Sequence, residues 1–399
     1  MNKTGERFIV FAVANSPQLM TGVRQYVNLL VGQLKRDYRG VDIVVVVSEE
    51  YDFISDLGQH SDVLKVTVPK NEITPIFKRK GLMQRLLNFL FCNKGNDNTY
   101  NKMFENIEPG LVFYTVYSTF SDFPRWANNN GYKVVSVVHD IRAVSRLNNS
   151  ATLGNIKSFV SNMRHLTCII NSSCLVLVPN AYVKGFLKKF FSSNNLYESF
   201  AVPEISRTTR ALVNKGTRQY LYFPATIIES KYHIHLLQLF LSEKVRGSGL
   251  RLVLTGTNWD SSLGCELQEF IIKHELSPYV EHLGFVSRDD QEALYRNALA
   301  TVFPTRDESF NLGIWESFAF GSPVICSDDK ELLMQVEGAA CVFKFGDIQD
   351  LESKVFQLLR SEVVREEYIR KGRERYRNCA KGRLLSNEVI VKINTIINS

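Results

Sequence analysis

The sequence predicts an α/β fold made of two Rossmann-like domains, each with a doubly wound parallel sheet. Short runs rich in valine, isoleucine, leucine and phenylalanine recur along the chain and alternate with stretches whose apolar residues have helical spacing. This alternation stops between residues 197 and 218 and then resumes. A chain of 399 residues that is 45% hydrophobic can bury two separate cores.

In the first half, the apolar runs expected to form buried parallel strands are 8–14, 41–47, 63–68, 111–116, 133–138 and 174–178. The first run is followed by a loop and then by apolar residues at helical spacing between positions 23 and 34. Gly22 stands at the predicted start of that helix, where the lack of a side chain would let an oxygen-rich ligand approach the backbone. An ordinary helix-entry glycine is an equally good interpretation.

Residues 197–218 lack periodicity and carry proline, serine, threonine and basic residues, which predicts a linker between the domains. The expected boundaries are residues 1–205 for the first domain and 206–381 for the second. In the second half, strands are expected at 219–223, 250–255, 280–286 and 299–303, and an amphipathic helix is expected at 289–298.

Glu308 and Glu316, with seven residues between them, mark the most informative stretch. A buried strand runs into a polar loop and then a short helix, which should stop at Gly321. In a parallel sheet such loops lie at the carboxyl ends of the strands, where ligands bind. The backbone amides of Asn311, Leu312 and Gly313 would open the helix and be free to hold a phosphate between the two carboxylates.

This stretch, ESFNLGIWESFAFGSPV, resembles the EGFGLPxLEAMAxGxPV element of retaining GT-B glycosyltransferases, especially family 4, the glycosyl transferases group 1. Ser309, Asn311 and Gly313 depart from the Gly, Gly and Pro of that element. The resemblance implies two domains that face a cleft and a C-terminal helix, 382–399, that crosses back onto the first domain. It also implies that Glu316 holds the ribose of a nucleotide sugar and that Glu308 holds the hydroxyl groups of the donor sugar. Without the flanking motif, the better interpretation would be a solvated loop acid for Glu308 and an acid that favours the helix dipole for Glu316.

Several other residues gain a role from the same resemblance. Lys231 matches a family lysine that binds the diphosphate, whereas Thr226 stands where the family has an arginine. A threonine lacks the guanidinium fork that grips phosphate. His139, at the end of a predicted strand, matches a histidine that faces the donor sugar, and it is a third candidate catalytic residue beside Glu308 and Lys231. Outside the resemblance, Lys231 would be a surface lysine and His139 a loop residue.

The resemblance further implies that the base of the nucleotide is framed by two strand ends, at Gly256 and at Phe285 with Val286. No metal site is expected, because the adjacent Asp328 and Asp329 would point to opposite faces of an extended backbone. The nucleotide sugar would be a substrate, and no cofactor is expected. Helix ends and cationic side chains would neutralise the leaving diphosphate.

Composition narrows the function class. The excess of 48 basic over 41 acidic residues gives a net charge of +7, which suits anionic ligands or an anionic membrane surface, and no nucleic-acid-binding motif is visible. Seven cysteines without paired spacing favour a reducing compartment. The N-terminal segment superficially resembles a signal peptide, but the apolar run there is better explained as the first strand. A cytoplasmic protein without a transmembrane helix is therefore expected.

Residues 76–94 carry five basic residues and no acidic one beside a stripe of leucine and phenylalanine. Such a basic amphipathic helix can lie on an anionic membrane, although a surface helix whose apolar stripe packs on the domain core is an equally good interpretation. Some family-4 enzymes use lipid-linked acceptors, so the resemblance favours peripheral membrane contact.

The resulting hypothesis is a retaining, metal-independent glycosyltransferase that moves a hexose-type sugar to a hydroxyl of a glycan or glycolipid. Two alternatives stay open at this point. Thr226 in place of arginine favours a catalytically weak partner subunit that binds glycans, and a nucleotide-sugar epimerase has a related fold. The sequence does not specify the oligomeric state.

Overall fold

The computed structural model describes residues 7–12, 20–48, 63–68, 97–115, 122–139, 153–199, 202, 205, 219–306, 308, 310–380 and 384–399. The chain forms two compact units. The first comprises Met1–Ala201 together with Arg383–Ser399, and the second comprises Val202–Gly382.

The first unit contains a parallel sheet with strand order β3-β2-β1-β4-β5-β6-β7. Its strands are β1 (Arg7–Ala12), β2 (Asp42–Ser48), β3 (Leu64–Val68), β4 (Leu111–Tyr114), β5 (Lys133–Val137), β6 (Leu175–Val178) and β7 (Leu196–Glu198). Its helices are α1 (Met20–Asp37), α4 (Asp97–Met103), α5 (Phe123–Asn129), α7 (Leu153–Ser172), α8 (Ala181–Lys188) and α17 (Asn387–Asn398).

Both faces of this sheet are covered, as the continuous apolar runs predict. Because successive side chains of a strand point to opposite faces, Phe11 of β1 lies in a core with α4, α5, α7 and α8. Its neighbour Val10 lies in a separate core with α1 and α17. Each face of the sheet therefore has its own helical layer.

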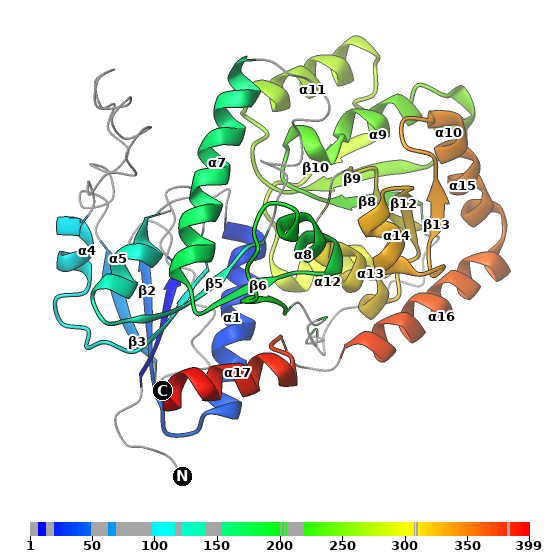
Figure 1. The fold of residues 1–399 in the computed structure, drawn as a ribbon. Helices are drawn as coiled ribbons and strands as arrows, with labels where there is room; N and C mark the ends of the chain where they lie inside the picture. Colours follow the sequence, from blue (N-terminus) through cyan, green and yellow to red (C-terminus); the bar gives the residue numbers. More distant parts are fainter. Residues whose placement is uncertain are drawn as a thin grey trace. The chain divides into compact units, whose positions relative to one another are not determined.

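The C-terminal helix α17 is built into this first unit (Figure 1). The buried Gln33 of α1 accepts hydrogen bonds from the amides of Leu384 and Leu385 at 2.6 and 2.8 Å, and it donates to the carbonyl of Leu385 at 3.1 Å. Lys133 of β5 donates to the carbonyl of Ile396 at 2.6 Å, which places a cation at the negative end of the α17 dipole. These bonds fix both ends of the segment that follows residue 383.

The second unit contains a parallel sheet with strand order β10-β9-β8-β11-β12-β13. Its strands are β8 (Tyr220–Pro224), β9 (Arg251–Thr255), β10 (Val280–His282), β11 (Ala300–Phe303), β12 (Val324–Ser327) and β13 (Cys341–Phe343). Its helices are η5 (Glu229–Lys231, 3-10), α9 (His233–Leu239), α10 (Glu243–Gly247), α11 (Ser262–Lys273), α12 (Arg288–Asn297), α13 (Leu312–Phe320), α14 (Lys330–Val336), α15 (Ile348–Arg360) and α16 (Glu362–Cys379).

The strand order of the second sheet reverses beside β8. From β8 the chain first builds outward through β9 and β10, and it then returns to the other side of β8 to add β11, β12 and β13. The loops after β8 and β11 therefore leave neighbouring strands in different directions, and this crevice is where parallel α/β sheets bind ligands.

The structure corrects two sequence-based predictions. Tyr197 and Glu198, placed at the start of the linker, belong to β7 (Leu196–Glu198), the seventh strand of the first sheet. The strand expected at 280–286 ends at His282, because the chain turns at Gly284 with φ +68°. The basic segment 76–94 lies outside the described residues. Within the described part of the chain, no helix combines the length and the apolar character needed to cross a membrane.

Helix α16 packs closely against helix α13. Gly372 of α16 lies against Phe318 of α13, and a Cβ there would come within 2.5 Å of the ring. Gly321, in the left-handed conformation at the end of α13 with φ +77°, leaves room for the guanidinium of Arg373. A side chain at Gly372 would therefore push the two helices apart, and one at Gly321 would displace the Arg373 guanidinium and strain a left-handed backbone.

His233 is a buried polar residue at the start of α9, and its side chain is 3% exposed. Its Nε2–H donates to the carbonyl of Ala225 at 3.3 Å, and no described residue pairs with its Nδ1. Burial, opposed by this hydrogen bond and aided by the charge of Lys231, lowers the pKa of His233 to about 4. The folded protein therefore keeps this imidazole neutral at mildly acidic pH.

We predict that His233 makes the protein sensitive to acid. The unfolded chain binds a proton on this histidine below about pH 6.5, whereas the folded chain does so only below about pH 4, so stability is lost as the pH falls between these values. The loss should approach about 3 kcal/mol at the lower limit. Thermal denaturation from pH 7 to pH 4.5 should show a smaller fall in Tm for His233→Gln than for the wild type. A matched His274→Gln variant should follow the wild type, and equal pH dependence of all three proteins would contradict the prediction.

Candidate functional site

An ion pair joins the two loops that flank β8 and β11. Lys231, in the 3-10 turn after β8, contacts Glu308 in the loop after β11 through Nζ and Oε1. Glu308 is 4% exposed and Lys231 is 20% exposed, so both charges are largely removed from water. A lysine ammonium has three donors, and the contact with Glu308 occupies one of them. The pair therefore places a cation and a carboxylate together where the strand order of the sheet reverses.

Glu316 lies one turn into α13 and is 5% exposed. Its Oε1 accepts a hydrogen bond from Nη1 of Arg288 at 2.6 Å, which also makes an ion pair. Its Oε2 accepts a hydrogen bond from the hydroxyl of Tyr295 at 2.7 Å. Both partners belong to α12, the amphipathic helix before β11. Neither partner is predicted from the sequence, because the residue spacing of α12 does not show which of its side chains face the carboxylate.

Tyrosines complete the surroundings of Glu316. Tyr222 of β8 packs edge-on against Tyr295 with ring centroids 5.0 Å apart, and its hydroxyl is 2.9 Å from the hydroxyl of Thr255. Burial, together with the Glu316 carboxylate, raises the pKa of both tyrosines. The hydroxyl of Tyr295 therefore stays protonated and donates at every accessible pH.

The amino end of α13 differs from its prediction. Asn311 precedes the helix as expected, but its backbone amide already donates to Oε1 of Gln335 at 3.0 Å in a buried contact, so it is not free for a ligand. Helix α13 begins at Leu312, whose amide together with that of Gly313 belongs to the first turn. A Cβ on Gly313 would lie 2.8 Å from the ring of Phe303. Glycine is thus needed here because β11 and α13 pack closely.

The backbone segments that follow β8, β9 and β10 lie close together. Gly256 has φ +136°, and a Cβ there would lie 2.4 Å from the carbonyl oxygen of Ala225. The amide of Gly256 donates to the carbonyl of Gly284 at 2.8 Å. The hydroxyl of Thr226 lies 3.3 Å from that of Thr257. The residue in place of the family arginine thus turns toward the neighbouring strand end.

Phe285 follows Gly284 directly, and its side chain is 69% exposed, which is a high value for an aromatic residue. The neighbouring Val286 is half-buried. A flat apolar surface beside exposed backbone is suited to stacking a planar heterocycle.

Two predicted residues belong to the first unit. Nε2–H of His139 donates to the carbonyl of Thr115 at 2.9 Å, and its ring packs edge-on against Tyr26 at 4.8 Å. Gly22 lies in the first turn of α1. The structure therefore brings Lys231, Glu308, Glu316 and the start of α13 together in the second unit, and it places His139 and Gly22 in the other unit.

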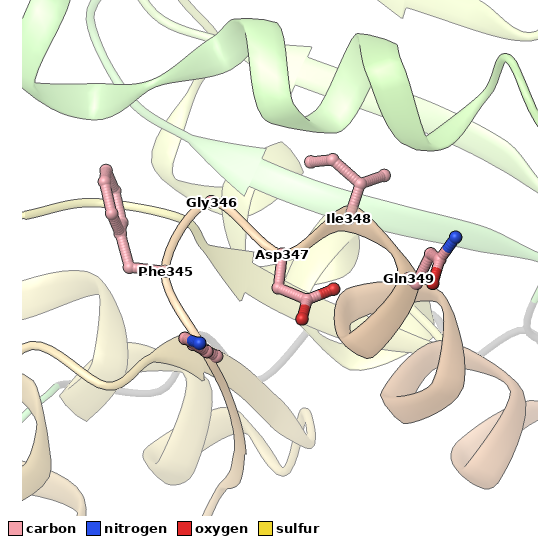
Figure 2. Close-up of a pocket in the computed structure, with 6 residues that line it drawn as sticks. Phe345, Gly346, Asp347, Ile348 and Gln349 are labelled. Atoms are coloured by element: carbon pink, nitrogen blue, oxygen red, sulfur yellow. The ribbon is translucent and has the colours of Figure 1, made fainter.

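A shallow pocket at the loop after β13 is lined by residues 344–349 (Figure 2). Its polar groups are largely satisfied within the loop: Asp347 accepts from the amide of Asp350 at 2.9 Å, and the amide of Phe345 donates to Asp328 at 2.9 Å. Phe345 packs edge-on against Tyr232, the residue after Lys231, at 4.8 Å. This pocket adjoins the Lys231 loop and contains none of the predicted site residues. Among the described residues, no group of three or more potential ligands is placed to hold a metal ion.

Comparison with known proteins gives a consistent picture. Residues 205–375 match the model of the family described as glycosyl transferases group 1. The O-antigen chain mannosyltransferase B of Escherichia coli is 28% identical over 116 residues, which is 29% of this chain and 30% of that protein. The O-antigen chain mannosyltransferase RfbU of Salmonella typhimurium is 30% identical over 96 residues, 24% and 27% of the two chains. These matches thus span less than a third of the length of either relative.

Solved structures resemble the chain over nearly its full length. HepE of Anabaena, in complex with UDP and glucose, is 14% identical with a TM-score of 0.65 and 98% coverage of both chains. A variant of TarM from S. aureus, in complex with fondaparinux, alpha-GlcNAc-glycerol and UDP, is 11% identical with a TM-score of 0.70, and the likeness covers 99% of this chain and 100% of that one. At these identities the likeness establishes the fold, which is GT-B. Residues 205–375 are therefore similar to the glycosyl transferases group 1 family, and the chain has the two parallel α/β domains of the GT-B fold.

Proposed function

We propose that this protein is a retaining glycosyltransferase that moves a hexose-type sugar from a nucleotide-diphosphate sugar to a hydroxyl of a glycan or glycolipid. The observation that carries the proposal is the buried ion pair of Lys231 and Glu308 between the loops after β8 and β11. Beside it lie the first turn of α13 and the second buried carboxylate, Glu316. A cation and helix amides suit a diphosphate, and carboxylates suit hydroxyl groups.

In this proposal the carboxylate of Glu316 accepts hydrogen bonds from the ribose hydroxyls, and that of Glu308 accepts hydrogen bonds from hydroxyls of the donor sugar. Lys231, with the amides of Leu312 and Gly313, stabilises the charge that develops on the leaving diphosphate. The bond between the anomeric carbon and the phosphate oxygen breaks while the acceptor oxygen bonds to the same face of that carbon, and the acceptor's proton passes to the departing phosphate. The configuration at the anomeric carbon is therefore retained without a covalent sugar–enzyme intermediate.

The relatives suggest the substrate class. Two of them are mannosyltransferases of O-antigen chains, which favours a hexose donor and a growing polysaccharide as acceptor. UDP is present in the structures of HepE and TarM, which favours a nucleoside diphosphate as the leaving group. We assign the second unit to the nucleotide sugar and the first unit to the acceptor side, and we keep His139 and Gly22 of the first unit as candidate residues for the donor.

A second candidate function rests on Thr226. The hydroxyl of this threonine is directed to Thr257, and the guanidinium that family members use for the diphosphate is missing at this position. A catalytically weak subunit that binds donor or glycan without efficient transfer would have this feature. Measurement of product formation distinguishes a glycosyltransferase from such a subunit, since the subunit would bind nucleotide sugar without forming product.

The test of donor binding is a thermal-shift screen against UDP, GDP, ADP and their hexose conjugates. A ligand that binds only the native state stabilises it by about 2.7 kcal/mol at a concentration a hundredfold above Kd, so one nucleotide series should raise the Tm clearly. Glu316→Ala should abolish that shift, because it removes both acceptor oxygens. Glu374→Ala, at an exposed pair on α16, should retain it. Absence of any shift in the wild type would remove the proposed function.

The catalytic assignment predicts that Lys231→Ala lowers kcat/KM for sugar transfer by about a hundredfold or more, as expected when a stabilising donor to a developing anion is lost. The measurement is product formation with the donor found in the screen. Lys371→Ala, at a half-exposed pair with Glu367, serves as the matched control and should leave kcat/KM unchanged. Wild-type kinetics in Lys231→Ala, with an unchanged Tm, would show that the lysine is not part of the site.

We also propose a cytoplasmic enzyme that touches an anionic membrane through residues 76–94, supported by the basic and apolar composition of that segment. Sedimentation with anionic liposomes should be salt-sensitive. It should weaken when Lys78, Arg79 and Lys80 are all changed to serine, because each basic residue near the surface contributes about 1 kcal/mol. Neutral liposomes are the control. Equal, negligible sedimentation of both proteins with both kinds of liposome would exclude this contact and favour a soluble acceptor.

A further inference from the structure

The carboxylate of Glu316 is held on both of its oxygens. Oε1 accepts from Arg288 at 2.6 Å and Oε2 accepts from Tyr295 at 2.7 Å, while the side chain is 5% exposed. An ionised carboxylate has about four acceptor positions, two on each oxygen. Arg288 and Tyr295 use one position on each oxygen, which leaves one further position on each. This pair of positions matches the two neighbouring hydroxyls of a vicinal diol.

The two donors are themselves fixed. The ring of Tyr295 is fully buried between Tyr222 and Phe320, with centroid distances of 5.0 and 5.6 Å. The guanidinium of Arg288 also donates to Gln291 at 2.8 Å and lies 5.3 Å from the ring of Phe320. Burial opposes the charge of Arg288, but Glu316, Tyr295 and Glu292 together favour it, so the pKa of Arg288 is raised. Both groups are therefore permanent donors at fixed positions.

We propose that Arg288 and Tyr295 are positioning residues that keep Glu316 ionised and oriented as a clamp for the 2′,3′-diol of the nucleotide's ribose. This inference rests on the proposed function, because it concerns the carboxylate assigned to the ribose. It adds the two residues that make the carboxylate selective. A nucleotide without the 2′-hydroxyl would leave one buried acceptor position unpaired and should bind more weakly.

The two residues should act through different physical effects. Among the charged groups around Glu316, the other acid of α12, Glu292, is already paired with Arg296 at 2.5 Å. Tyr222 and Tyr295 stay neutral because their pKa values are raised. Arg288 is therefore the cation that keeps this buried carboxylate charged. Without Arg288, burial would favour the protonated acid, whose O–H is a donor where the ribose needs an acceptor.

Tyr295 contributes orientation, since Arg288 would still keep the carboxylate charged without it. The Tyr295→Phe variant should therefore lose selectivity for the diol at every pH. The Arg288→Gln variant should instead lose affinity in a pH-dependent way, with weak binding at low pH that recovers as the pH rises. A merely structural role for either residue would not produce these two different signatures.

The experiment is calorimetric titration of UDP, GDP and ADP, each with its 2′-deoxy counterpart, at pH 6, 7 and 8. Affinities are expressed relative to the wild type at each pH, so that ionisation of the nucleotide cancels. The wild type should prefer the ribonucleotide by about tenfold or more. Arg288→Gln should bind it at least about tenfold more weakly at pH 6 and recover partly at pH 8, and Arg288→Lys should restore most of the affinity. Tyr295→Phe should lower the ribose preference by a similar factor at all three pH values.

Arg370→Gln, at an exposed pair on α16, is the matched control and should bind as the wild type does. Equal affinity of Arg288→Gln and wild type at pH 6 would overturn the proposal. So would a loss in Arg288→Gln that neither depends on pH nor is restored by lysine. If Arg288→Gln does not fold, Arg288→Lys and Tyr295→Phe still decide the question, since the preference of Tyr295→Phe for the ribonucleotide over its 2′-deoxy counterpart must be lower than that of the wild type. If the wild type binds none of the diphosphates, the proposed function fails, whereas equal binding of ribo- and deoxynucleotides by the wild type overturns only this inference.

Discussion

The second unit depends on neutralising two carboxylates that are almost completely removed from water. An isolated ionised carboxylate costs several kcal/mol to bury, so each needs a cation and hydrogen bonds of its own. Glu308 forms an ion pair with Lys231 of the loop after β8, and Glu316 forms one with Arg288 at the start of α12. These pairs tie four separate segments to one crevice. A carboxylate held in this way can still accept hydrogen bonds from sugar hydroxyls.

The carboxylates can be placed this way because α13 is held rigidly at its far side. Gly372 lets α16 touch Phe318, and Arg375 of α16 donates to the carbonyls of Gln335 and Met334 at 3.0 and 3.1 Å at the end of α14. The side chain of Gln335 in turn accepts the amide of Asn311 at the entry to α13. The amino end and one face of α13 are thus both fixed by helices that follow it in sequence. A substitution in α16 can therefore alter the carboxylates without touching a ligand.

Much of this arrangement was predictable from the sequence. The buried strands β1 to β6 and β8 to β11, and the stop of α13 at Gly321, followed from apolar runs and from glycine's freedom to adopt positive φ. The short strands β7 and β13, of three residues each, were not predicted from the sequence. The pairing of Glu316 with Arg288, 28 residues away, also escaped. Such a contact depends on how α12 rotates on the sheet, which its own hydrophobic pattern fixes only to one broad face.

The charge balance of the site bears on how a donor would be bound. Lys231 and Arg288 offset Glu308 and Glu316 one for one, so these four residues together carry no net charge toward a diphosphate. Thr226 adds no cation where family members have an arginine. The negative charge of the ligand must then be met by Lys231, which has donors beyond its contact with Glu308, and by the first amides of α13. Lys231 would contact both Glu308 and the phosphate. Binding of the sugar hydroxyls by Glu308 and binding of the leaving diphosphate are therefore coupled through one ammonium group. Binding of the intact nucleotide sugar, rather than of either half alone, is what such a shared cation favours.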